Sequence, residues 1–212
     1  MTIHTVVALH PRASFYPIFW RLRLNIPSKF VPPVSPTPCT RTYWVLDNVF
    51  LAGAYPGHSD PMDHRQRIKS LFDAGMRTFI NLQEENEANN SGLPFVRYDN
   101  ELRRLADEQD EPIAHLRFPI PDGGTTSTDR MRCILDAIDL SLTSDRPVYV
   151  HCFGGMGRTG TTVCCWLRRH GLVSADNVLG LLTQLRQADV QRASWKAPEN
   201  ASQETFVLSW AD

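Results

Sequence analysis

The amino-acid sequence predicts a single α/β domain with a central, mostly parallel sheet flanked by helices. From Tyr43 onward, short apolar runs typical of buried strands alternate with runs of helical spacing. The most strand-like run, 147–150, is followed by a glycine-rich segment and then by a helix-spaced run that begins at Arg158. We therefore expect a binding loop between a strand and a helix, at the carboxyl end of the sheet.

Hydrophobic spacing and turn residues predict the individual elements. Ile68, Leu71 and Phe72 recur at helical spacing, for example, and Gly75 then ends that helix. The expected strands cover residues 43–46, 49–52, 77–82, 113–118 and 147–150, and the expected helices cover residues 61–74, 101–109, 128–142, 158–170, 175–187 and 201–209.

The N-terminal residues differ in composition from the rest of the chain. Prolines recur throughout residues 1–42, and no acidic residue precedes Asp47. A length of 212 residues suits one ordinary domain plus an extension. We therefore expect residues 1–42 to form a Pro-rich, flexible extension and residues 43–212 to form the folded domain. Basic residues in the extension leave a targeting or membrane-surface role open, although the prolines would interrupt a long amphipathic helix.

The overall composition is that of a globular protein outside the membrane. The formal net charge is only -1, which does not favour a nucleic-acid partner. No apolar run approaches the ~20 residues that cross a bilayer, so no membrane partner is expected. The five cysteines form neither a C-x-x-C pair nor a small disulfide scaffold, and we expect a reducing, cytoplasmic location. The sequence leaves the oligomeric state open.

Segment 151–160 carries the residues that point to a chemistry. Cys152 directly follows the predicted strand, and Arg158 stands six residues later, where the next helix begins. Between them, Gly154, Gly155 and Gly157 allow left-handed backbone conformations and a close approach to a ligand. Such a loop can turn successive N–H groups inward, and the helix N-terminus adds further donors. A phosphate dianion is the ligand that suits this arrangement.

The side chains around this loop suit nucleophilic chemistry on phosphorus. Arg158 can hold two phosphate oxygens with its planar guanidinium. The positive surroundings should stabilise Cys152 as a thiolate, which is the nucleophilic form. Thr159 can donate its hydroxyl to the sulfur and ease its departure, and His151 would orient the loop.

An acid is also needed to protonate the departing oxygen, and Asp122 is placed for that role. It lies in a Pro- and Gly-punctuated segment, 118–124, that leaves a predicted strand and could close over a bound phosphate. As a carboxylic acid it would protonate the leaving oxygen, and as a carboxylate it would then activate water.

The pattern Cys152-x-x-x-x-x-Arg158-Thr159, preceded by His151, resembles the signature of the cysteine-based protein tyrosine phosphatase superfamily. Asp122 lies 30 residues before Cys152, a spacing similar to that of the compact dual-specificity branch. The resemblance extends from about Tyr43 to the C-terminus and implies a catalytic domain over residues 43–212. It implies hydrolysis of phosphate monoesters through a phosphocysteine intermediate on Cys152, without a metal or cofactor. The implied substrate-binding residues are Phe153, Gly154, Gly155, Met156, Gly157 and Arg158.

The resemblance also bears on the substrate. Phe153 and Met156 are apolar, whereas branches that act on inositol lipids often carry lysines in this loop. A phosphorylated protein is therefore the expected partner, with phosphotyrosine as the main substrate and phosphoserine or phosphothreonine left open. A phosphoinositide or inositol phosphate substrate is the alternative. In the superfamily a glutamine near position 203 can position hydrolytic water, so Gln203 either has this role or packs and caps the last helix.

Two other functional classes fit the motif less well. Residues 155–160 match G-x-G-x-x-G, but a dinucleotide-binding fold needs a second strand ending in an acidic residue ~20 residues on, and residues 172–185 are helix-spaced. An inactive phosphate-binding module would usually lack the nucleophile, the arginine or the acid, and all three are present.

Other polar residues have ordinary structural interpretations. His151, Cys152, Cys164, Cys165 and His170 could be read as zinc ligands, but the adjacent cysteines would point about 100° apart on a helix and are expected in the core. One of them could also act as a resolving thiol. A carboxylate of the Glu84, Glu85 and Glu87 group could anchor Arg158 from behind, but a solvated acidic loop is the favoured interpretation. Asp129 and Asp136 are expected at the surface.

Overall fold

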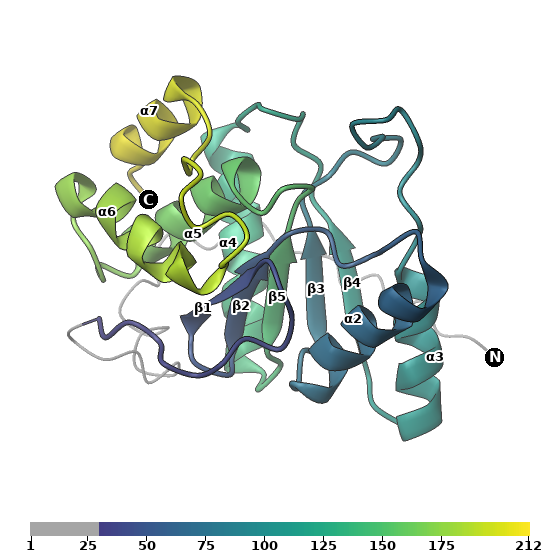
Figure 1. The fold of residues 1–212 in the computed structure, drawn as a ribbon. Helices are drawn as coiled ribbons and strands as arrows, with labels where there is room; N and C mark the ends of the chain where they lie inside the picture. The colour runs from purple at the N-terminus through teal and green to yellow at the C-terminus, as the bar shows by residue number, and fades with distance from the viewer. Residues whose placement is uncertain (1–29) are drawn as a thin grey trace.

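The computed structural model describes residues 30–212, so most of the predicted extension lies outside the described residues. Its centre is a five-stranded sheet with the order β1-β2-β5-β3-β4 (Figure 1). Only the pair β1 and β2 is antiparallel, and the other neighbours run parallel. The strands are β1 (Thr42–Leu46), β2 (Phe50–Gly53), β3 (Thr78–Asn81), β4 (Ala114–Arg117) and β5 (Val148–His151). The predicted single α/β domain with a mostly parallel sheet is confirmed.

Helices cover both faces of the sheet, because side chains alternate between its faces. Phe50 and Ala52 of β2 pack with α4, α5, α6 and α7, whereas Leu51 packs with α2 and α3. Figure 1 shows α4 to α7 grouped at one side of the molecule and α2 with α3 at the other. The helices are α2 (Pro61–Asp73), α3 (Asp99–Gln109), α4 (Thr128–Thr143), α5 (Gly157–Arg169), α6 (Ala175–Leu185), a short 3₁₀ turn η1 (Arg186–Ala188) and α7 (Ala201–Ser209).

Local sequence explains where the helices begin and end. Asp60 accepts hydrogen bonds from the first N–H groups of α2, and Pro61 occupies the position where an N–H would have no partner. Ser127 and Asn200 cap α4 and α7 in the same way. The predicted helix 175–187 ends as an α-helix at Leu185 and continues only as the 3₁₀ turn, and none of the helices within residues 30–212 is long and apolar enough to cross a membrane.

Residues 30–41, which the sequence assigns to the extension, lie against the domain. Asp47 accepts hydrogen bonds from the backbone of Val34 and Ser35, and the indole of Trp44 donates to the carbonyl of Pro36 at 3.1 Å. Arg41 reaches the loop that follows β5. This part of the chain therefore contributes contacts close to the candidate site.

The sheet order places one loop at its centre. β5 lies between β2 and β3, and His151 at its end pairs with Gly53 of β2 and Asn81 of β3. The carboxyl ends of the three strands therefore meet, which is where α/β sheets bind ligands. The loops after β2, β3 and β5 share this edge.

Candidate active site

The loop from Cys152 to Met156 follows β5 and leads directly into α5, as predicted. Gly155 has a φ of +76°, and a Cβ there would lie 2.6 Å from the backbone of Gly53, so only glycine fits. Its N–H donates to the sulfur of Cys152 at 3.3 Å. The sulfur of Cys152 therefore accepts a hydrogen bond from the backbone of its own loop, a contact expected of an anion-binding loop.

Arg158 is almost fully buried and is anchored from behind by Glu87. Its Nη1 donates to Oε2 at 2.5 Å and its Nη2 donates to Oε1 at 2.9 Å. Burial alone would raise the pKa of Glu87, but hydrogen bonds from Arg158 and Gln83 hold it below its ordinary value. The interpretation of this acidic group as a solvated loop is therefore wrong for Glu87, because its carboxylate is buried and bonded by both Gln83 and Arg158. Glu84 and Glu85 are exposed, as that interpretation expected.

Asp122 lies beside the same guanidinium. Its carboxylate accepts from Arg158 Nη2 at 2.8 Å, and 67% of its side chain is exposed. Arg158 Nη1 also donates to the carbonyl of Ile120 at 3.1 Å, in the same segment. The structure thus brings together Arg158, the loop that carries Cys152 and the segment 118–124 that carries Asp122. We refer to the segment 118–124 as the acid loop.

Two predicted site residues have different contacts from those expected. The hydroxyl of Thr159 donates to the carbonyl of Gly53, at the end of β2, at 3.4 Å instead of to the sulfur of Cys152. Met156 is 4% exposed and belongs to the core cluster that includes α5, and its Cε lies 3.1 Å from the position that a Cβ of Gly154 would occupy. Its role in substrate binding stays a prediction.

His151 is fully buried beneath the loop, where it can orient the loop as predicted. Its Nε2 lies 2.5 Å from the hydroxyl of Tyr98, which also lies 2.9 Å from Nε2 of His115. Burial lowers the pKa of His151 to about 3, so the imidazole is neutral at physiological pH. Sequence inspection assigned no role to Tyr98, which reaches His151 from the position just before α3.

Gln203 links the last helix to the acid loop. Its Oε1 accepts from the backbone N–H of Glu199 at 3.0 Å, and its Nε2 donates to the carbonyl of Gly124 at 3.1 Å. Asn200 adds a bond of 2.8 Å to the carbonyl of Gly123. These contacts support the packing role that the sequence left open for Gln203, because both ends of its amide are engaged.

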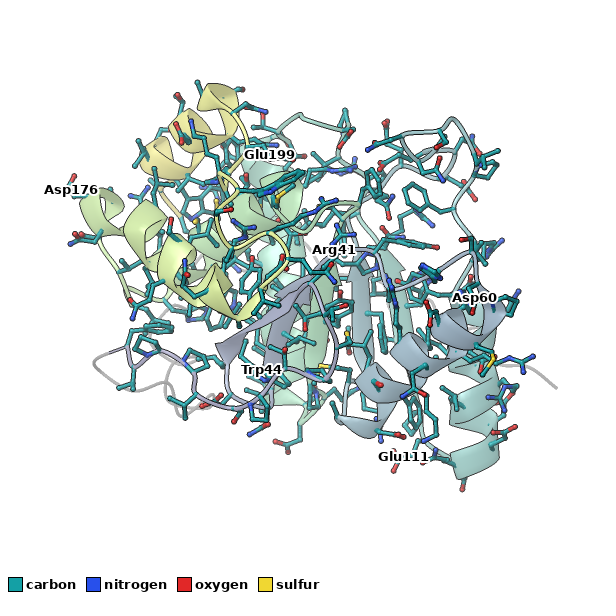
Figure 2. All side chains as sticks on the ribbon, viewed as in Figure 1. Arg41, Trp44, Asp60, Glu111, Asp176 and Glu199 are labelled. Carbon is teal, nitrogen blue, oxygen red and sulfur yellow. The ribbon has the colours of Figure 1, made fainter. Side chains whose placement is uncertain are left out.

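Glu199 is a further carboxylate at the site, to which sequence inspection gave no role. A Cβ added to Gly157 would clash with its carboxylate, which also accepts a hydrogen bond from the Gly157 N–H. Partial burial and the nearby Asp122 raise the pKa of Glu199 above its ordinary value. Figure 2 labels Glu199 beyond the carboxyl end of the sheet. Its place directly after Pro198 and four residues before Gln203 was the available signal.

Aromatic rings line another side of the loop. Phe153 meets the edge of Phe95 with ring centroids 5.0 Å apart, and Phe95 lies 4.6 Å from the ring of Tyr55. The hydroxyl of Tyr55 donates to the carbonyl of Val96 at 2.6 Å and thereby fixes the segment that carries Phe95. We refer to Tyr55, Phe95 and Phe153 as the aromatic wall.

The remaining candidate ligands do not converge. Cys164 and Cys165 are fully buried in the core, and burial raises the pKa of both thiols. Within residues 30–212, no group of three or more His, Cys, Asp or Glu side chains is arranged to hold a metal ion. Asp129 is exposed and Asp136 pairs with Arg169, so neither reaches the loop.

Comparison with known proteins agrees with this fold. Protein tyrosine phosphatase domain-containing protein 1 of Mus musculus is 26% identical over 148 residues, which cover 70% of this chain and 19% of that protein. The chain thus spans about a fifth of this relative's length. The structure of kinase-associated phosphatase aligns with a TM-score of 0.59 at 18% identity, covering 74% of this chain and 83% of that one. PTPMT1 in complex with PI(5)P aligns with a TM-score of 0.58 at 17% identity, covering 79% and 92%.

A family model described as "Polymorphic toxin system, DSP-PTPase phosphatase" matches residues 53–172, which is more than half of the chain. This span includes the aromatic wall, the acid loop and the loop from Cys152 to Arg158. The chain therefore belongs to the DSP-PTPase phosphatase family and has the fold of a compact, dual-specificity-phosphatase-like cysteine phosphatase.

Proposed function

We propose that this phosphatase hydrolyses phosphotyrosine in proteins through a phosphocysteine intermediate on Cys152. The observation that carries the proposal is the aromatic wall beside the loop. Phe95 and Phe153 lie beside the loop in which the phosphate would bind. Aromatic rings in this position would pack well against the phenyl ring of a bound phosphotyrosine. A phosphoserine side chain offers no ring for this contact.

In the first chemical step, the sulfur of Cys152 attacks phosphorus. An S–P bond forms while the P–O bond to the tyrosine oxygen breaks, and Asp122 gives its proton to that oxygen. The backbone N–H groups of the loop and the fork of Arg158 stabilise the three equatorial oxygens of the transferring group. Glu87 orients the guanidinium of Arg158, because Nη1 and Nη2 both donate to its carboxylate.

In the second step, water attacks the phosphocysteine and passes a proton to the carboxylate of Asp122. The S–P bond breaks, and Cys152 returns as a thiolate beside the Gly155 N–H. In the free protein, Asp122 is paired with Arg158. Substrate phosphate would replace that contact, which moves the carboxyl group toward the leaving oxygen.

A phosphoinositide or inositol phosphate substrate is the alternative, supported by the likeness to PTPMT1, whose structure contains PI(5)P. Phe153 and the buried Met156 provide no cationic side chain for additional phosphates within the loop itself. The loop composition therefore favours a phosphorylated protein.

The test is a substrate panel assayed with the full chain in reductant and chelator. We expect the highest kcat/KM for phosphotyrosine peptides, compared with phosphoserine and phosphothreonine peptides, phosphoinositides and inositol phosphates. Cys152→Ser should abolish turnover yet still bind phosphate. Cys133→Ser, which changes an exposed cysteine of α4, is the matched control. A preference for a lipid or inositol phosphate would overturn the substrate assignment, and near-normal turnover by Cys152→Ser would overturn the covalent mechanism.

A further inference from the structure

Two arginines flank the outer side of the phosphate loop at Gly154. Arg41, just before β1, donates from Nη2 to the Gly154 carbonyl at 3.2 Å. Nη1 of Arg192, which lies between η1 and α7, is 3.5 Å from the position that a Cβ of Gly154 would occupy. Figure 2 places Arg41 near the carboxyl ends of the strands, on the side of the molecule that also carries Glu199. The two guanidiniums therefore stand at the rim of the loop, from segments far apart in the sequence.

These two charges lack close neutralising partners. Among residues 30–212, neither Arg41 nor Arg192 has a carboxylate oxygen within 4.0 Å. The nearby Asp189 is buried and engaged, because it accepts from the Arg192 backbone N–H at 3.3 Å and lies 4.0 Å from Arg186. Glu199 faces Arg192 only at longer range. The charge of Arg192 acts unfavourably on Arg41, and an anion bound near both guanidiniums would relieve that repulsion.

Arg41 itself shows the cost of this arrangement. Its Nε is buried and has no partner within the described residues. Burial, followed by the charge of Arg192, lowers the pKa of Arg41 from its ordinary value. The guanidinium of Arg41 is thus held at the loop by the bond from Nη2 to Gly154, while its buried Nε donor has no partner among the described residues.

The segment that carries Arg192 is fixed in place. Arg186 is fully buried and donates to the carbonyls of Trp195 and Arg192 at 2.6 and 2.7 Å. The guanidinium of Arg192 lies 4.6 Å from the centre of the Trp195 ring, and that ring is 53% exposed. Stacking of this kind orients the planar fork and leaves its edge free for an anion.

We propose that Arg41 and Arg192 form a second anion subsite, which binds an acidic or phosphorylated side chain flanking the phosphotyrosine of a peptide substrate. This inference rests on the proposed function, since the aromatic wall selects the ring and the arginines then meet the neighbouring residue. A carboxylate and a phosphoryl group each present two oxygens that a guanidinium can bind at the same time. The subsite would therefore raise affinity for acidic sequences around the phosphotyrosine.

The experiment measures peptide binding in the Cys152→Ser background, which does not depend on turnover. Three phosphotyrosine peptides differ only at the flanking positions, which carry neutral residues, glutamate or phosphoserine. We expect the glutamate and phosphoserine peptides to bind about fivefold more tightly than the neutral peptide. Adding Arg192→Gln should bring this ratio close to one, and Arg192→Lys should give an intermediate ratio, because the charge remains but the fork is lost. Arg65→Gln, which changes an exposed arginine of α2, should leave the ratio unchanged.

The outcomes separate the two proposals. Equal ratios with and without Arg192→Gln, or no preference for acidic peptides, would overturn the subsite even if the wild-type chain hydrolyses phosphotyrosine. A preference that depends on Arg192, together with failure of the wild-type chain to hydrolyse any of the peptides, would support the subsite and overturn the proposed function. If an inositol bisphosphate shows the Arg192-dependent gain over a monophosphate and the peptides do not, the peptide assignment is wrong.

Discussion

Arg158 and Glu87 form a buried, bidentate ion pair across 71 residues of sequence. The pair prevents the guanidinium of Arg158 from rotating away from the loop, since both of its terminal nitrogens donate to the Glu87 carboxylate. Orientation of the phosphate-binding arginine thus depends on a loop between β3 and α3 that does not itself touch the nucleophile.

Glu87→Gln tests this dependence. The amide keeps the shape but removes one acceptor and the charge, so we expect kcat/KM to fall by up to about 10²-fold as the fork loses its orientation. We also expect a loss of about 1–3 kcal/mol in the free energy of unfolding. Steady-state kinetics and denaturant titration measure both effects. Glu85→Gln is the control, because Glu85 is exposed in the same loop. Similar losses in both variants would show that the loop acts only through its net charge.

Asp122→Ala tests the acid. General acid catalysis supplies ~10²–10⁴-fold, and the benefit grows with the basicity of the leaving group. Turnover of alkyl phosphates should therefore fall most, whereas activated aryl phosphates should be affected less. Asp129→Ala is the matched control at the start of α4, because its carboxylate is exposed and paired with Arg132. Equal losses on all leaving groups would remove Asp122 from the role of acid.

Glu199→Gln tests how a second carboxylate affects phosphate binding. When ionised, Glu199 holds the Gly157 N–H and repels a phosphate dianion, so its neutral variant should bind phosphate about 3- to 10-fold more tightly near pH 7. Because burial and the nearby Asp122 raise its pKa, wild-type Glu199 takes up a proton at a higher pH than an ordinary glutamate as the solution is acidified. The difference between the two proteins should then shrink. Inhibition constants for inorganic phosphate over a pH series give the measurement.

The control for that experiment is Glu204→Gln, which removes a carboxylate of α7 that is paired with Lys196. It should leave phosphate inhibition unchanged. If the inhibition constants of Glu199→Gln and the wild type agree at every pH, Glu199 does not compete with phosphate.

The buried histidine predicts a pH dependence of stability. His151 keeps a pKa of about 3 when folded, against an ordinary value of 6.5, so the unfolded chain binds a proton that the folded chain does not between these two values. Its contribution to stability is therefore complete above about pH 6.5 and is lost as the pH falls toward 3. Denaturant titrations between about pH 4 and 7 should show a shallower decline for His151→Asn than for the wild type. An unchanged slope would mean that His151 is already protonated in the folded state.

The strongest sequence signals were those with a local physical cause. The order of strands and helices and the loop from Cys152 to Arg158 follow from hydrophobic spacing and from glycines next to a cysteine and an arginine, and the structure has them within a few residues. Asp122 was also found, because a Pro- and Gly-rich segment after a strand marks a loop.

What the sequence could not provide were partners brought together by the fold. Nothing near Glu87 distinguishes it from Glu84 and Glu85, and only the turn after β3 directs it to Arg158. The Tyr98 contact with His151 depends on how α3 packs, and the approach of Arg41 to Gly154 depends on the sheet order. The burial of Met156 could not be read from an apolar residue in a loop whose other apolar member, Phe153, belongs to the aromatic wall.

The ties from Gln203 and Asn200 to the acid loop have a consequence for the order in which activity appears during synthesis. The nucleophile, the arginine and the acid are all translated before α7, yet the acid loop is held by residues that leave the ribosome after them. A nascent chain that ends before residue 200 would carry the complete signature motif with an untethered acid loop. Turnover that depends on the acid should therefore begin only when the last helix has docked and holds the loop that carries Asp122.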